Sequence, residues 1–251
     1  MTDMHPSIVA FADGEVGLNC VSWLASRYKN DIAMLFTTEQ NQIFETATAN
    51  GLNAQVFENE KSCIEKIDNY QNDIDLGLLL WWPKLISPLL IEKTKHGFIN
   101  THPSLLPHNR GRHYNFWCLV EQCPFGVSLH LVEEGIDCGS VVAQSHIDYS
   151  WEDTGETLYR KALNEMKALF KNTYPSLRSL SFNATPQDLS TGSIHYASEL
   201  KQASTIDLDE TKTARQLLNL LRARTFRGHP ACTFKDGEVE YEARIQITKK
   251  Q

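Results

Sequence analysis

The sequence predicts an α/β protein with a Rossmann-like, mostly parallel sheet, followed by a small module of one helix and a β-hairpin. Short apolar runs alternate with helix-like patterns through the first half of the chain, as in βαβ units. The run Leu76–Trp82 is apolar on every side, which is typical of a central strand covered on both faces. Near the end of the chain, the Asp236-Gly237 pair separates two strand-like segments and indicates a hairpin.

The individual elements follow from the periodicity of apolar residues. The expected strands are Ser7–Ala12, Ile32–Thr37, Gln55–Phe57, Leu76–Trp82, Phe98–Thr101, Phe125–Val132 and Ser140–Tyr149. The expected helices are Leu18–Ser26, Phe44–Asn50, Pro88–Lys95 and a long one over 153–177. Asp153 and Glu156 stand at capping-box spacing where this long helix is expected to begin.

A change of composition over Asn183–Ser193 predicts a domain boundary, because small and polar residues cluster there. We therefore expect a catalytic domain over 1–182 and a second module over 183–251. That module should contain a helix over Glu210–Arg222, then a hairpin of Cys232–Phe234 with Val239–Ile247. A lone hairpin is marginally stable, so it needs the catalytic domain or a second subunit to pack on, and we expect a homodimer.

Composition narrows the possible functions. The net charge of −7 over 251 residues, without a basic patch, argues against a nucleic-acid partner. There is no signal peptide and no long apolar stretch, so a cytoplasmic protein without a membrane partner is expected. The six cysteines lack CxxC spacing, which indicates free thiols and no structural zinc.

The segment Phe98–Gln144 contains the residues suited to catalysis. Asn100 and His102 are two apart at the end of an expected strand, so their side chains share a face, and a turn through Asp137 can bring a carboxylate beside them. An amide, a histidine and a carboxylate suit acyl transfer to an amine, in which the amine itself attacks. Alone, His102 would be interpreted as structural and Asp137 as a turn residue; together with Asn100 they favour catalysis.

The runs INTHPSLLP, RGRHYNFW, FGVSLHLVEEGIDCG and VVAQ resemble the family of formyltransferases that use 10-formyltetrahydrofolate. The resemblance implies the catalytic trio Asn100, His102 and Asp137 and no metal. It also implies a pterin pocket formed by Lys84, Leu85, Ile86, Glu133, Glu134, Gly135, Ile136 and Asp137. Arg112 falls where relatives place an arginine that contacts substrate or folate.

Within the family, NRGRHYNFW, WWP and LLRARTFRGHPACTF resemble the branch that formylates amino sugars carried on nucleotides. This implies a dTDP-linked amino-dideoxyhexose, with the amine at C4 as the first expectation and at C3 as the alternative. The substrate site is expected at His108, Asn109, Arg110, Gly111, Arg112, His113 and Arg224, and Arg222 is a further candidate for the phosphates.

Two alternatives remain open. A methionyl-tRNA formyltransferase shares the trio but is expected to carry a larger, basic carboxyl-terminal domain. A silent folate- or nucleotide-binding protein would not need an intact trio.

Several residues have a simpler interpretation. Without the resemblance, His108, His113, His130 and His146 are expected to be structural or solvent-facing, with His113 the first exception because it lies in the substrate-side loop. Trp81 and Trp82 are expected to belong to the core. Gly14 and Gly17 form half of a dinucleotide fingerprint, which indicates a tight turn instead of a nicotinamide site.

Overall fold

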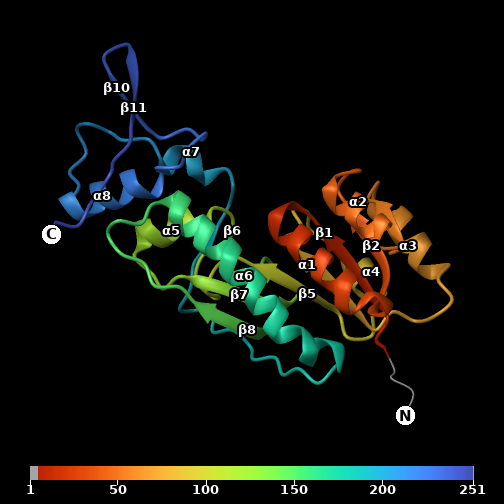
Figure 1. Ribbon diagram of the computed structural model, residues 1–251. Coiled ribbons are helices and arrows are strands. Elements are labelled where there is room, and N and C mark those ends of the chain that lie inside the picture. The colour runs from red at the N-terminus through yellow and green to blue at the C-terminus, as the bar shows by residue number, and fades with distance from the viewer. Residues whose placement is uncertain (1–4, 251) are drawn as a thin grey trace. The chain divides into compact units, whose positions relative to one another are not determined.

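The structure, a computed structural model, describes residues 5–250 (Figure 1). Its strands are β1 (Ile8–Ala12), β2 (Ile32–Thr37), β3 (Ala54–Val56), β4 (Leu76–Leu80), β5 (Phe98–His102), β6 (Arg110–Gly111), β7 (Gly126–Leu131), β8 (Val141–His146), β9 (Ile194–His195), β10 (Cys232–Asp236) and β11 (Val239–Ala243). Its helices are α1 (Gly14–Arg27), the 3-10 turn η1 (Lys29–Asp31), α2 (Gln42–Ala49), α3 (Glu60–Asp68), α4 (Pro88–Ile91), α5 (Tyr114–Glu121), α6 (Gly155–Arg178), α7 (Glu199–Ala203) and α8 (Ala214–Ala223).

The chain forms two compact units that are interleaved in sequence. The first, here called the sheet unit, comprises the chain up to residue 102 together with 128–144 and 166–187. The second, here called the hairpin unit, comprises 103–127, 145–165 and 188–251. These units are discontinuous in sequence, whereas the expected boundary between 182 and 183 divides the chain once. That boundary stays a prediction.

The sheet unit is built on a seven-stranded sheet of order β3-β2-β1-β4-β5-β7-β8. The pairs from β3 to β5 are parallel, and β5 pairs with β7 antiparallel. The α/β class and the mostly parallel sheet are therefore confirmed. Parallel neighbours require crossover connections, and α1, α2, α3 and α4 lie in those connections.

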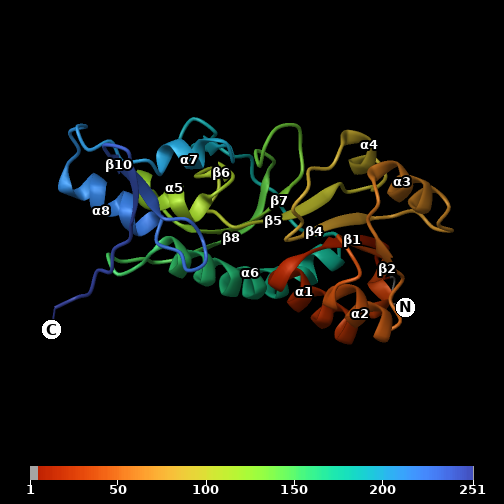
Figure 2. The ribbon, with the colours of Figure 1, turned by 90° about the horizontal axis from the view of Figure 1, so that it is seen from above.

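Helices cover both faces of this sheet, which explains its nearly continuous apolar strands. Figure 2 shows α3 and α4 on one side of the sheet and α1 and α2 on the other. On the first side, Phe11, Phe36, Phe98 and Trp82 form the apolar core with residues of α3 and α4. On the other, Trp23 of α1 packs edge-on against Phe170 of α6, with ring centroids 6.3 Å apart.

The hairpin unit packs α5 against α8. Arg222 of α8 is buried and donates to the carbonyls of Ser150 (2.6 Å) and Asp153 (3.3 Å) and to Asn219 Oδ1 (2.9 Å). Its guanidinium therefore holds the segment before α6, and the interpretation of Arg222 as a phosphate ligand was wrong. The expected carboxyl-terminal helix and hairpin are confirmed, with α8 beginning at Ala214 behind a Thr213–Gln216 capping box.

Element ends differ from the expectations in two instructive places. The cap of α6 joins Thr154 and Thr157, each side chain accepting from the other's N–H, so the expected Asp153–Glu156 box was wrong by one residue. The strand expected to reach Trp82 ends at Leu80, because Trp81 takes a positive φ of 61° and turns the chain. No helix within residues 5–250 is long and apolar enough to cross a membrane.

Candidate active site

The candidate site lies in the sheet unit, on the strands β5 and β7. Asn100 and His102 alternate with Thr101 along β5 and so share one face. The antiparallel register places Asn100 directly opposite His130 and His102 opposite Ser128. Phe98, the next residue along this face, belongs to the apolar core under α3 and α4. The face thus changes from apolar to polar toward the carboxyl end of β5, where ligands of such sheets bind.

Asp137, in the loop that joins β7 to β8, meets these side chains. Its Oδ2 lies 3.4 Å from His102 Nδ1, and its Oδ1 lies 3.5 Å from both His130 Nε2 and Asn100 Nδ2. His102 is 4% exposed and His130 2%, so the charge of Asp137 acts on them with little screening by solvent. The structure therefore brings together the three residues of the predicted trio and adds a second histidine.

His130 has a defined tautomer. Its Nδ1 lies 2.7 Å from the Leu131 carbonyl oxygen, which only accepts hydrogen bonds, so Nδ1 carries the proton. In the neutral ring, Nε2 is then an acceptor, and it lies 3.1 Å from Asn100 Nδ2. One N–H of Asn100 therefore donates to His130 Nε2, and the other N–H of Asn100 points at Asp137 Oδ1.

The loop that carries Asp137 is cross-linked through its own residues. The Ser140 N–H donates to Glu133 Oε1 (3.0 Å), and the Cys138 thiol donates to the Glu134 carbonyl (3.0 Å). A Cβ on Gly139 would overlap the Leu131 carbonyl, so only glycine allows the loop to lie this close to β7. Gly135 has a φ of 100°, which also requires glycine.

The segment after β4 was expected to form the other side of a pterin pocket. Lys84 lies over the Phe57 ring, 4.5 Å from its centroid, and the Leu85 side chain is 82% exposed. Trp81 is held by its N–H, which donates to Thr101 Oγ1 (2.7 Å). The exposed Leu85 offers apolar surface to a ligand, and the pterin contacts of this segment stay a prediction.

The expected substrate residues His108–His113 and Arg224 lie in the hairpin unit. Asn109 is buried and its Nδ2 donates to Glu121 Oε2 (2.8 Å) and Ser193 Oγ (3.2 Å), so this side chain holds the segment in shape. Arg110 and Arg224 each keep a buried Nε without a hydrogen-bond partner among the described residues. Burial and the charges of Arg224 and Arg112 lower the pKa of His113.

Two further features bear on ligands. The potential ligand atoms of His102, His130 and Asp137 lie within 4.8 Å of one another, a set that could also hold a metal ion. Because Asn100 Nδ2 faces both His130 Nε2 and Asp137 Oδ1, we interpret the set as a hydrogen-bonded cluster.

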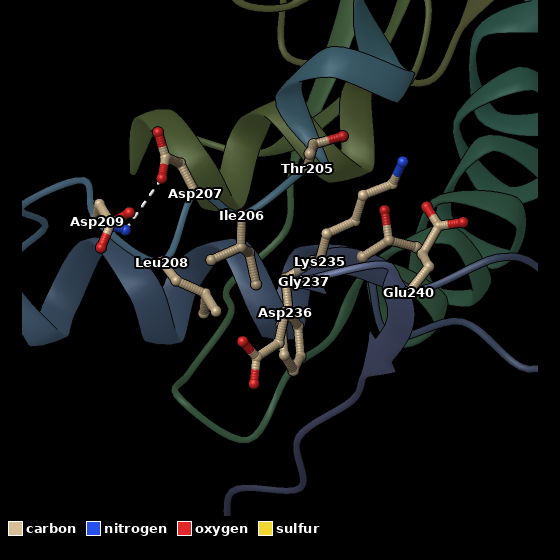
Figure 3. Close-up of a pocket in the computed structure, with 11 residues that line it drawn as sticks. Thr205, Ile206, Asp207, Leu208, Asp209, Lys235, Asp236, Gly237 and Glu240 are labelled. Carbon is tan, nitrogen blue, oxygen red and sulfur yellow. Dashed lines mark hydrogen bonds between the residues drawn. The ribbon is translucent and has the colours of Figure 1, made fainter.

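In the hairpin unit, a pocket of about 480 Å³ lies between segment 205–209 and the β10–β11 hairpin (Figure 3). Four of its eleven described lining residues are acidic and one is a lysine, and the predicted site residues are not among them.

Sequence reasoning missed His130, which was expected to be structural or solvent-facing. Its signal was present in the alternation of Val127, Leu129 and Leu131 against His130, which places His130 on the polar face of its strand. Sequence reasoning also missed Gln187, whose Nε2 donates to the carbonyls of Asp137 (2.9 Å) and Gly139 (2.6 Å). No motif near Gln187 indicates this contact.

Comparisons with known proteins agree with the geometry. Residues 21–173 match the model of a family described as formyl transferase, and residues 199–249 match one described as N-formyltransferase dimerization C-terminal domain. A methionyl-tRNA formyltransferase of Thermodesulfovibrio yellowstonii is 32% identical over 149 residues, which are 59% of this chain and 47% of that protein. The chain thus matches about half the length of this curated relative.

Solved structures share the fold. A 4-N formyltransferase from Francisella tularensis has a TM-score of 0.81 at 22% identity, over 98% of this chain and 99% of that one. An N-formyltransferase from Helicobacter canadensis, in complex with folinic acid and dTDP-3-aminofucose, has a TM-score of 0.68 at 16% identity, over 97% of both chains. Because the first family model covers more than half of the residues and includes the whole Asn100–Asp137 cluster, the chain belongs to the formyl transferase family.

Proposed function

We propose that this protein transfers a formyl group from 10-formyltetrahydrofolate to the amine of a dTDP-linked amino-dideoxyhexose. The observation that carries the proposal is the cluster of Asn100, His102 and Asp137, with the carboxylate 3.4 Å from the imidazole, in a chain of this family. The cosubstrate and the sugar nucleotide are supported by the Helicobacter relative, whose structure holds folinic acid and dTDP-3-aminofucose.

In the proposed mechanism, the amine of the sugar is the nucleophile. When the formyl donor is bound, the Asn100 N–H that otherwise faces Asp137 binds the formyl oxygen. His102 stabilises the negative charge that this oxygen gains in the tetrahedral intermediate. The new bond joins the amine nitrogen to the formyl carbon, and the bond from that carbon to the folate nitrogen breaks. His102 moves the proton from the amine to the leaving nitrogen, while Asp137 orients the imidazole and stabilises its charged form.

The sugar nucleotide is assigned to the arginines of the hairpin unit. Arg110 and Arg224 keep buried Nε donors without partners among the described residues, and a buried donor gains most from a charged acceptor. A pyrophosphate supplies such acceptors in the fork geometry that guanidinium groups match. The C4 amine is our first choice. Of the two solved relatives named above, the 4-N formyltransferase has the higher TM-score, 0.81 against 0.68.

We also propose a homodimer formed through the hairpin. Val239 and Tyr241 of β11 are 52% and 45% exposed, so the strand presents apolar surface that a second subunit can cover. The matched carboxyl-terminal model over residues 199–249, described as a dimerization domain, supports a dimer. Light scattering of the purified protein should give twice the 28.5 kDa of the chain; a monomer mass at micromolar concentration would contradict the proposal.

The decisive experiment supplies 10-formyltetrahydrofolate with separate acceptors and follows the release of tetrahydrofolate. The acceptors are dTDP-4-amino and dTDP-3-amino dideoxyhexoses and charged initiator tRNA. Release with a dTDP-amino sugar supports the proposal, and the rates on the two sugars decide between C4 and C3. Release with tRNA alone indicates the methionyl-tRNA alternative. Folate binding without release from any acceptor indicates a silent binding protein.

A further inference from the structure

Asp137 occupies an uncommon backbone conformation for a residue with a side chain. Its φ is 49°, in the left-handed region, which aspartate tolerates better than most residues but does not enforce. The position of its carboxylate beside His102 therefore depends on whatever holds the backbone of the loop in place. The cross-links of Glu133 and Cys138 join residues on either side of Asp137, and neither touches Asp137 itself.

Gln187 supplies a direct contact to this backbone from fifty residues further along the chain. Its Nε2 donates one hydrogen bond to the Asp137 carbonyl (2.9 Å) and one to the Gly139 carbonyl (2.6 Å). A side-chain amide has two N–H donors, and both acceptors are carbonyl oxygens, so the orientation of this amide is fixed. The two bonds span Cys138 and clamp the loop on both sides of it.

The residues before Gln187 are anchored to the sheet, so the clamp has a fixed base. Val141, the first residue of β8, and Thr185 exchange two backbone hydrogen bonds, each 2.8 Å long. Gln187 follows Thr185 by two residues and is the last residue of the sheet unit. The loop is thus held between the start of β8 and a side chain that is itself tied to β8.

We propose that Gln187 is a positioning residue for Asp137: its two hydrogen bonds hold the loop in the shape that keeps the carboxylate beside His102. This inference rests on the proposed function, in which Asp137 acts on His102 during formyl transfer. Gln187 touches neither substrate in this proposal. It acts only through the backbone of Asp137 and Gly139.

The test compares Gln187→Met with Gln42→Met in the full chain. Methionine matches glutamine in length but has no N–H donor, and Gln42 is an exposed residue at the start of α2. Because a displacement of about 1 Å in a catalytic group costs up to about 100-fold, we expect kcat to fall about 10- to 100-fold in Gln187→Met. The KM for the amino sugar should stay within about 3-fold of the wild-type value. Gln42→Met should match the wild type in both.

A second readout needs no substrate, so it separates this inference from the proposed function. The ring signals of His102 and His130 in ¹H–¹⁵N NMR spectra should move in Gln187→Met and stay unchanged in Gln42→Met, because Asp137 lies beside both rings. If Gln187→Met melts below the assay temperature, both readouts are taken on Gln187→Asn, whose amide is one methylene too short to reach both carbonyls. Unchanged ring signals in the folded variant, or a kcat within 2-fold of wild type, would overturn the proposal. A wild-type protein that transfers no formyl group, but whose ring signals respond to Gln187→Met, would refute the proposed function alone.

Discussion

Replacing Asp137 by asparagine keeps the shape of the side chain and removes one negative charge beside His102. The Asp137 Oδ2 to His102 Nδ1 distance is 3.4 Å, and both groups are largely buried. Two unit charges at that distance attract by about 5 kcal/mol at an effective dielectric constant of about 20. If the imidazole is charged in the transition state, as the proposed mechanism requires, this attraction is worth about three to four powers of ten in rate.

The assay is the release of tetrahydrofolate in the presence of a dTDP-amino sugar, with kcat and KM measured separately. We expect Asp137→Asn to lower kcat by about 1,000- to 10,000-fold, with small changes in KM. The chain offers a matched control, because His146 Nδ1 and Asp148 Oδ1 also lie 3.4 Å apart, but on an Asp148 side chain that is fully exposed. Asp148→Asn should leave the rate unchanged. A loss below about 10-fold in Asp137→Asn would refute the electrostatic role of this carboxylate.

Two further predictions concern the hairpin unit. Burial and the charges of Arg224 and Arg112 lower the pKa of His113, so the His113 ring should titrate below its ordinary range in NMR spectra. The phosphates of added dTDP neutralise these arginines and should raise the titration midpoint of His113. An unchanged midpoint would argue against phosphate binding there. Burial would raise the pKa of Asp153, but hydrogen bonds from the Ser150 N–H, Lys161 and Thr157 outweigh it and lower this pKa. The stability that a depressed carboxyl pKa contributes is present above pH ~4 and is lost as the pH falls through the folded-state pKa. Asp153→Asn should therefore destabilise the protein by about 2 kcal/mol at pH 7 and by much less near pH 2. Urea unfolding at the two pH values measures the difference, and an equal loss at both would contradict the electrostatic origin.

Local pattern was sufficient to predict the sheet. Leu76–Leu80 is apolar on both faces and lies in the middle of the sheet, and Ile32–Thr37 is a strand with the expected bounds. Patterns of this kind predict strands because a strand that is covered on both faces needs apolar side chains on both faces. The end of β4 was not predictable from pattern, because Trp81 takes a positive φ and its backbone N–H donates to Thr101 Oγ1, twenty residues further along the chain.

The candidate site was predictable only in part, because its residues depend on different kinds of information. Asn100 and His102 are two positions apart on one strand, so period-two alternation alone places them on one face. His130 requires the register of β7 against β5, and the sequence does not specify this register across a separation of thirty positions. Gln187 requires the path of the chain after α6, and a glutamine among small polar residues resembles any surface glutamine.

Register is therefore the quantity on which the site depends most. A shift of β7 by one residue against β5 would turn His130 to the opposite face, away from Asn100 and Asp137. Two contacts help to hold the end of β7. Gly139 lies against the Leu131 carbonyl, where a side chain would overlap it. The Leu131 N–H also donates to the Ser140 carbonyl (2.9 Å). Gln187 binds the carbonyl of that same glycine. The loop that delivers the carboxylate of Asp137 and the contact that fixes the end of β7 thus share one residue, so a single displacement of Gly139 would move both partners of Asn100 at once.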